Sequence, residues 1–92
     1  MKYTIEMSTK FKKDYKRVIK RPGHKPEIFA NVVRMLSMEE TLPAKYRDHA
    51  LTGNYIGYRE CHILPDWLLI YKIEANTLTL VLTRTGSHSD LF

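Results

Sequence analysis

The chain has little cysteine and no long apolar run. Cys61 is its single cysteine, which excludes an intramolecular disulfide and favours the reducing cytoplasm. No segment reaches the ~18 consecutive apolar residues of a membrane helix, so we expect no membrane partner. The opening residues MKYTIEMSTK lack the apolar stretch of a secretory signal. We therefore expect a cytoplasmic protein.

The usual metal-ligand spacings are also missing. The sequence has no H-x-x-x-H pair and no C-x-x-C, which are patterns typical of zinc sites. Cys61 precedes His62 in a predicted strand, where neighbouring side chains point to opposite faces, so the two cannot pair as nucleophile and base. We predict a buried structural cysteine, no metal site and no cofactor.

The composition is typical of one small basic domain. The length of 92 residues and the hydrophobic share of 43% predict a single domain, residues 1–92, with a modest core. The net charge of +5 predicts an anionic partner, but charge alone leaves RNA, DNA, the ribosome and an acidic protein open.

Alternating and helical periodicities predict an α+β fold. The expected order is a strand over 2–7, helices over 9–20 and from 26 to about 39, an irregular segment over 41–57, strands over 58–64, 67–73 and 78–84, and a tail over 86–92. We expect two antiparallel helices packed on one face of a small, mostly antiparallel sheet. The side chains expected to be largely buried are Phe11, Tyr15, Val18, Ile28, Phe29, Val32, Leu69 and Val81.

The first predicted helix has a strongly basic outer face. Its charged residues are Lys10, Lys12, Lys13, Lys16, Arg17 and Lys20, against the single acid Asp14. A charge run is often only a solvated surface. Because this imbalance exceeds what solubility needs, we favour an electrostatic contact with RNA phosphates.

The second half of the chain contains four groups able to move protons: His49, His62, Asp66 and His88. Each alone has a plain structural interpretation, as a loop, sheet-surface, turn or tail residue. His62 shares a strand face with Glu60, and Asp66 follows Pro65 in a predicted turn. Histidine suits general acid and base work near neutral pH. We assign the fourth histidine, His24, to the loop between the helices, with no role.

Three motifs carry a resemblance to a known family. They are a DHxLxG segment from residue 48, an RxxHxxPDW segment from residue 59 and an RTGxHxxLF ending from residue 84. In this order they resemble the YafQ branch of the RelE superfamily, the toxins of bacterial type II toxin–antitoxin modules. The resemblance covers the whole chain in length and element order. The first 45 residues match in pattern only.

The resemblance implies an mRNA endoribonuclease that acts on messenger in the ribosomal A site. Family members cut without metal, by attack of the ribose 2′-hydroxyl on the adjacent phosphate. It also implies a cognate acidic antitoxin, with operator DNA bound only through the antitoxin complex. The implied acid–base set is His49, His62, Asp66 and His88. The implied substrate-binding residues are Arg84 at the phosphate, Arg59, and the aromatics Trp67 and Phe92.

The sequence leaves the individual roles open. We prefer His88 as general acid and either His49 or Asp66 as base, with His62 free to position groups or stabilise charge. We expect all of them, with Arg84, to converge on one pocket, with Gly86 letting the chain turn back towards the sheet. Two alternatives remain: a toxin of the same fold that is not a nuclease, like ParE toxins that inhibit gyrase, and a non-catalytic RNA-binding module.

Overall fold

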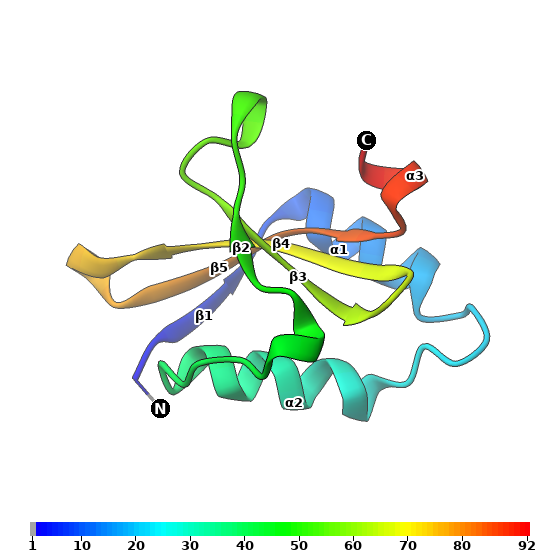
Figure 1. Cartoon of the computed structure of the whole chain (residues 1–92), viewed down its shortest axis with the longest axis horizontal. Coiled ribbons are helices and arrows are strands. Elements are labelled where there is room, and N and C mark those ends of the chain that lie inside the picture. The colour runs from blue at the N-terminus through cyan, green and yellow to red at the C-terminus, as the bar shows by residue number, and fades with distance from the viewer. Residues whose placement is uncertain (1) are drawn as a thin grey trace.

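The computed structural model describes residues 2–92, which fold into a sheet with its two long helices on one face (Figure 1). The strands are β1 Thr4–Met7, β2 His49–Ala50, β3 Arg59–Leu64, β4 Trp67–Glu74 and β5 Thr79–Gly86. The α-helices are α1 Thr9–Val18, α2 Pro26–Ser37 and α3 His88–Leu91. Three short 3₁₀ turns are η1 Ala44–Tyr46, η2 Gly53–Tyr55 and η3 Ala75–Thr77.

The sheet is mixed, and most of it is antiparallel. Its strand order is β1-β5-β4-β3-β2. The pairs β2–β3, β3–β4 and β4–β5 are antiparallel, whereas β1 runs parallel to β5. The predicted α+β class, with one strand, two helices and then a meander, is therefore confirmed.

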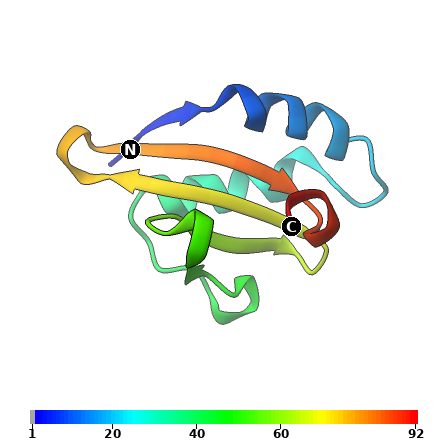
Figure 2. The ribbon, with the colours of Figure 1, turned by 90° about the horizontal axis from the view of Figure 1, so that it is seen from above.

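Local signals explain where the two long helices begin. The Ser8 side chain caps α1 by accepting a hydrogen bond of 3.0 Å from the Phe11 amide, which satisfies a free N–H at the helix start. Pro26 is the first residue of α2, where proline costs no hydrogen bond. Between them the chain reverses, so that α1 and α2 run in opposite directions (Figures 1 and 2).

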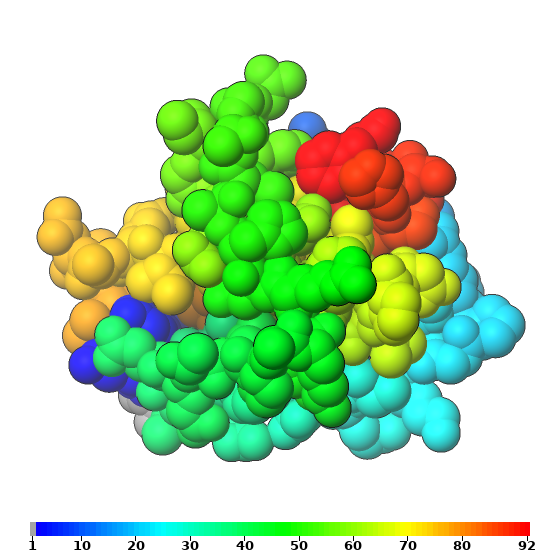
Figure 3. Space-filling model, in the orientation of Figure 1, coloured from blue at the N-terminus to red at the C-terminus, as the bar shows by residue number. Residues whose placement is uncertain are grey.

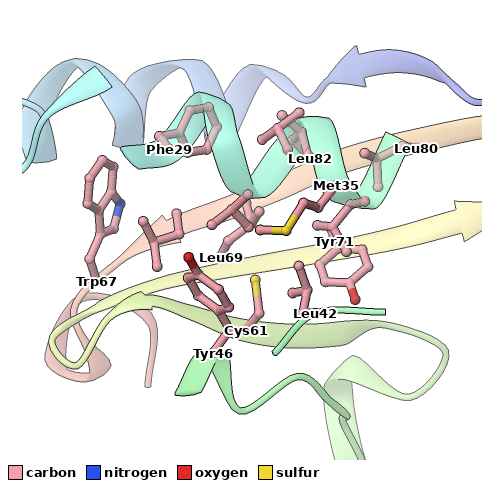
Figure 4. Packing of buried hydrophobic residues seen from close by; sticks show 14 of the residues in the cluster. Phe29, Met35, Leu42, Tyr46, Cys61, Trp67, Leu69, Tyr71, Leu80 and Leu82 are labelled. Atoms are coloured by element: carbon pink, nitrogen blue, oxygen red, sulfur yellow. The ribbon is translucent and has the colours of Figure 1, made fainter. Parts of the chain in front are cut away.

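Both helices pack their apolar stripes on the same face of the sheet (Figure 4). Five of the predicted core residues are buried: Phe11, Val18, Phe29, Val32 and Leu69. Tyr15 and Ile28 are only partly buried at the margin of this core. Val81 is also only partly buried, because it alternates with the core residues Leu80 and Leu82 and so points to the other face.

The opposite face of the sheet has a smaller cover that the sequence did not predict. Leu68 and Ile70 are buried there beneath Leu91 of α3, with Leu51 and Tyr55 beside them. The segment around β2 and η2 and the helix α3 both rise from this face (Figures 1 and 3). The segment expected to be irregular thus contributes an edge strand, and the expected tail ends in a helix. No helix within residues 2–92 is long and apolar enough to cross a membrane.

Candidate active site

Four of the predicted residues, His49, His62, Arg84 and His88, come from elements that border the sheet face opposite α1 and α2. The pairing register places His49 opposite Glu60, Glu60 opposite Ile70, and Ile70 opposite Arg84. A neighbouring row runs from His62 through Leu68 to Gly86. Because adjacent strands lie about 4.8 Å apart, the ends of the first row, His49 and Arg84, are three strand spacings or roughly 14 Å apart along the sheet, and the ends of the second row are roughly 10 Å apart.

Glu60 links two of the histidines. Its Oε1 lies 3.5 Å from Nε2 of His49 and 3.9 Å from Nε2 of His62. The Glu60 side chain is nearly buried, and its Oε2 is enclosed without a hydrogen-bond partner among the described residues. A buried carboxylate is stable only when charges or donors compensate it, so the two imidazoles are its natural partners.

The backbone orients both imidazole rings. Nδ1 of His49 lies 2.6 Å from the Arg47 carbonyl oxygen. Nδ1 of His62 lies 3.3 Å from the Pro65 carbonyl oxygen. A carbonyl oxygen only accepts hydrogen bonds, so each contact puts a proton on Nδ1. The Nε2 atom is then the one that can exchange a proton with a substrate or with Glu60.

Sequence reasoning did not select Glu60 as a site residue. The alternation of side chains along the predicted strand placed Glu60 and His62 on one face, and this was the sequence feature that could have pointed to Glu60. A carboxylate in the middle of a predicted strand is costly to bury unless it is paired. The pairing with His49 is set by the β2–β3 register, which the sequence did not show because β2 has only two residues.

Asp14 of α1 holds the side chain of Arg84 in place. Oδ2 of Asp14 accepts a hydrogen bond from Arg84 Nε at 2.6 Å, and Oδ1 accepts one from Nη2 at 3.2 Å. The amide of Thr85 also donates to Oδ2, at 3.2 Å. These contacts fix the guanidinium and raise the pKa of Arg84 further, chiefly through the hydrogen bond to Asp14.

Helix α3 carries His88 and Phe92 above the same face. The two rings pack against each other at a tilt of 33°, with 5.0 Å between centroids, and Phe92 meets Tyr55 of η2 edge-on at 5.9 Å. Ser87 and Asp90 form a capping box at the start of α3. The predicted turn at Gly86 is present, with φ +154, and a Cβ there would lie 2.8 Å from Asp90 Oδ2.

An ion pair between Arg21 and Asp90 ties α3 to the region just beyond α1. Arg21 Nη1 lies 2.6 Å from Asp90 Oδ2. The hydrogen bond from Arg21, followed by that from the Ser87 amide, holds the pKa of Asp90 well below its ordinary value. The position of His88 therefore depends on a contact between residues 69 positions apart in the chain.

Two further predicted residues lie away from these rows. Arg59 alternates with Glu60 along β3 and so points to the other face of the sheet; it donates hydrogen bonds to both carboxylate oxygens of Asp48, at 3.4 and 3.3 Å, and its side chain is 43% exposed. Asp66 is exposed in the turn between β3 and β4. The pKa of Arg21 is raised mainly by its hydrogen bond to Asp90, and the negative charge of Asp66 makes the smallest of the contributions that raise it.

Trp67 lies in the core on the helix side of the sheet. Its side chain is 0% exposed and packs against Phe29, and its expected role in holding or positioning RNA stays a prediction. Its indole N–H donates to Thr85 Oγ1 at 2.9 Å. A buried ring cannot stack on a base, so in this conformation Trp67 acts only through Thr85. His24 lies in the predicted loop between α1 and α2, where it is buried against Trp67, with 4.6 Å between the ring centroids.

Cys61 is the buried cysteine that we predicted. Burial raises the pKa of its thiol far above the ordinary value, which leaves no thiolate for nucleophilic attack or metal binding. Within residues 2–92, no group of three or more histidine, cysteine, aspartate or glutamate side chains is arranged to hold a metal ion. The residues present therefore do not form a metal-ligand set in this conformation.

Known proteins resemble this chain over almost its entire length. The mRNA interferase toxin YafQ of Escherichia coli K12 is 39% identical over 88 residues, which cover 96% of this chain and 94% of that protein. The crystal structure of a metal-bound toxin from Helicobacter pylori has a TM-score of 0.90 and 47% identity, covering 98% of this chain and 99% of that one.

A second solved structure shows a relative with its partner. YafQ in the E. coli DinJ–YafQ complex has a TM-score of 0.82 and 36% identity, and 98% of each chain is covered. The family model described as "Bacterial toxin of type II toxin-antitoxin system, YafQ" matches residues 3–92. The match is to the YafQ branch rather than to the ParE-type alternative. The chain belongs to the YafQ family of bacterial type II toxin–antitoxin toxins.

Proposed function

We propose that this chain is an mRNA interferase that cuts messenger in the ribosomal A site by metal-independent acid–base catalysis. The name of its E. coli relative, an mRNA interferase toxin, supports the substrate class. The observation that supports the chemistry is the row from His49 through the buried Glu60 to Arg84, with His88 above the same face.

The reaction needs three kinds of group. A base removes the proton from the ribose 2′-hydroxyl, whose oxygen then attacks the adjacent phosphorus. The bond from phosphorus to the 5′-oxygen breaks, and an acid protonates that oxygen as it leaves. A cation stabilises the negative charge that builds on the phosphoryl oxygens during the attack.

The geometry supports one distribution of these roles. His49 is the better base, because its Nε2 lies 3.5 Å from Glu60 in the row that ends at Arg84, whereas Asp66 is exposed in a turn. Arg84 supplies the positive charge at the phosphate. His88 is the general acid, and its packing against the Phe92 ring orients the imidazole. His62 shares the Glu60 carboxylate and stabilises the charge distribution around the base.

The basic surface supports two anionic partners. The exposed lysines and the arginine of α1 fit ribosomal RNA or the messenger backbone. They also fit an acidic antitoxin, in keeping with the DinJ–YafQ complex of the E. coli relative. Operator DNA is contacted only through that toxin–antitoxin complex. The chain acts in the cytoplasm, where the ribosomes are.

The test is single-turnover cleavage of a defined messenger on programmed ribosomes, with the cut site mapped by primer extension. His88→Ala should lower the rate by about 10²–10⁴-fold, the usual contribution of one acid–base group. Ser89→Ala is the matched control, because Ser89 is the exposed neighbour of His88 on α3. It should cleave like the wild type.

The same assay separates catalysis from mere binding. Suppose that the protein binds programmed ribosomes, but that neither the wild type nor any variant produces a new 5′ end in the messenger. The chain is then an RNA-binding module and the proposal is wrong. If His88→Ala cleaves as fast as the wild type, the assignment of the general acid is wrong. Cleavage of naked RNA at the same rate would contradict the requirement for the ribosome.

A further inference from the structure

The single acid of α1 is the only one of its charged residues that faces the core. Asp14 is 4% exposed, while the lysines and the arginine of the same helix are exposed. It lies on the stripe that also buries Phe11 and Val18. A carboxylate at such a position is normally replaced by an apolar residue unless it has a specific partner.

The partner is the arginine proposed to contact phosphate. Asp14 binds one side of the Arg84 guanidinium, through Nε and Nη2. It also accepts the amide of Thr85, so it holds both the side chain and the next residue of the backbone. These contacts leave Nη1 of Arg84 without a bond to Asp14.

Two other observations define the setting. Tyr55 of η2, on the site face, adds to the raised pKa of Arg84 after the larger effects of Asp14, so the guanidinium lies between α1 and η2. Arg17 also approaches Asp14, with Nη2 at 3.4 Å from Oδ1. One carboxylate therefore faces two guanidinium groups, and the cluster keeps a net positive charge that attracts phosphate.

We propose that Asp14 is a positioning residue for cleavage, acting on RNA only through Arg84. An arginine side chain is long, and a carboxylate that binds it at two points removes most of its rotational freedom before the substrate arrives. Stabilisation of a transition state requires such preorganised charge. The inference rests on the proposed function, because it gives Arg84 its role at the phosphate.

The test is a double-mutant cycle of Asp14→Asn and Arg84→Ala, measured as single-turnover cleavage on saturating programmed ribosomes. Asp14→Asn should lower the maximal rate by about 10²-fold, the cost of a misplacement of about 1 Å. The concentration for half-maximal rate should stay the same or fall, because a negative charge has been removed. In the Arg84→Ala protein, Asp14→Asn should change the rate less than twofold.

A purely structural role predicts a different pattern. Asp14→Asn would then lower the active fraction equally in both backgrounds, and that result would overturn the proposal. Glu39→Gln is the matched control, because the Glu39 carboxylate pairs with Lys2 and Tyr3 at 2.9 and 3.1 Å, outside the site. It should leave the rate unchanged. Circular dichroism of each variant checks that the fold is intact.

Arg84→Lys tests the same idea without touching Asp14, should Asp14→Asn fail to fold. Lysine keeps the charge but has one nitrogen, which cannot bind both carboxylate oxygens and still present a free donor. It should lose nearly as much rate as Arg84→Ala. A lysine variant with wild-type rate would overturn the proposal, whereas a fully active Arg84→Ala would refute the role of Arg84 itself.

Discussion

Removing Arg21 should loosen α3 and with it the general acid. Arg21→Met keeps most of the length of the side chain and removes the ion pair of 2.6 Å with Asp90. A hydrogen bond between charged groups contributes about 1.5–3 kcal/mol. The two side chains are 33% and 20% exposed, so solvent screening puts the loss near the lower end, at about 1.5 kcal/mol. That is roughly a tenfold decrease in the ratio of docked to undocked α3.

The loss should depend on pH in a defined direction. The pKa of Asp90 is lower in the folded protein than in the unfolded chain, so its contribution is present above the unfolded pKa of about 3.9 and is lost as the pH falls further. The difference in unfolding free energy between wild type and Arg21→Met should therefore be constant from pH 5 to 8. It should shrink below about pH 4.

Urea unfolding followed by circular dichroism at several pH values measures this difference. Amide exchange at Phe92, whose N–H bonds to the His88 carbonyl at 2.9 Å, reports the docking of α3 directly. Lys20→Met is the matched control, because it removes one positive charge from an exposed position beside Arg21. A difference that is absent, or that persists unchanged to pH 2–3, would refute the reasoning.

Three further results are expected. Glu60→Gln should lower the single-turnover cleavage rate by about 10–10²-fold with little change in ribosome binding, because the amide keeps the shape of the side chain but not the charge beside His49. Gly86→Ala should destabilise the protein in urea by about 1–3 kcal/mol, since the new Cβ meets Asp90; an unchanged midpoint contradicts this. Cys61 should react with a thiol reagent only after unfolding, because burial raises its pKa; rapid labelling of the native protein would show otherwise.

Local signals in the sequence determined most of the fold. The helical spacing of Phe11, Val18, Phe29 and Val32 predicted two helices and their buried faces, and the structure confirms both. The turn at Pro65–Asp66 was predicted from its turn-forming residues. The strands on either side of it were predicted from the alternation of side chains, and the structure contains both. These features depend on neighbours within a few residues, so sequence alone is sufficient to predict them.

Short elements were beyond this kind of prediction. The strand β2 has two residues and α3 has four, and neither is long enough to show a period. Both form because the second face of the sheet offers Leu68 and Ile70 as apolar surface to cover. Tertiary packing, rather than local propensity, decided their structure.

The sequence also determined the candidate residues through three motifs, whose order matches the YafQ family. Only the tertiary structure decided which of them face each other. Glu60 joins His49 and His62 because of the strand register, and a slip of one residue would turn it to the other face. Asp14 reaches Arg84 across 70 positions of the chain. Contacts at such distances in sequence depend on how helices and strands pack, so no local pattern encodes them.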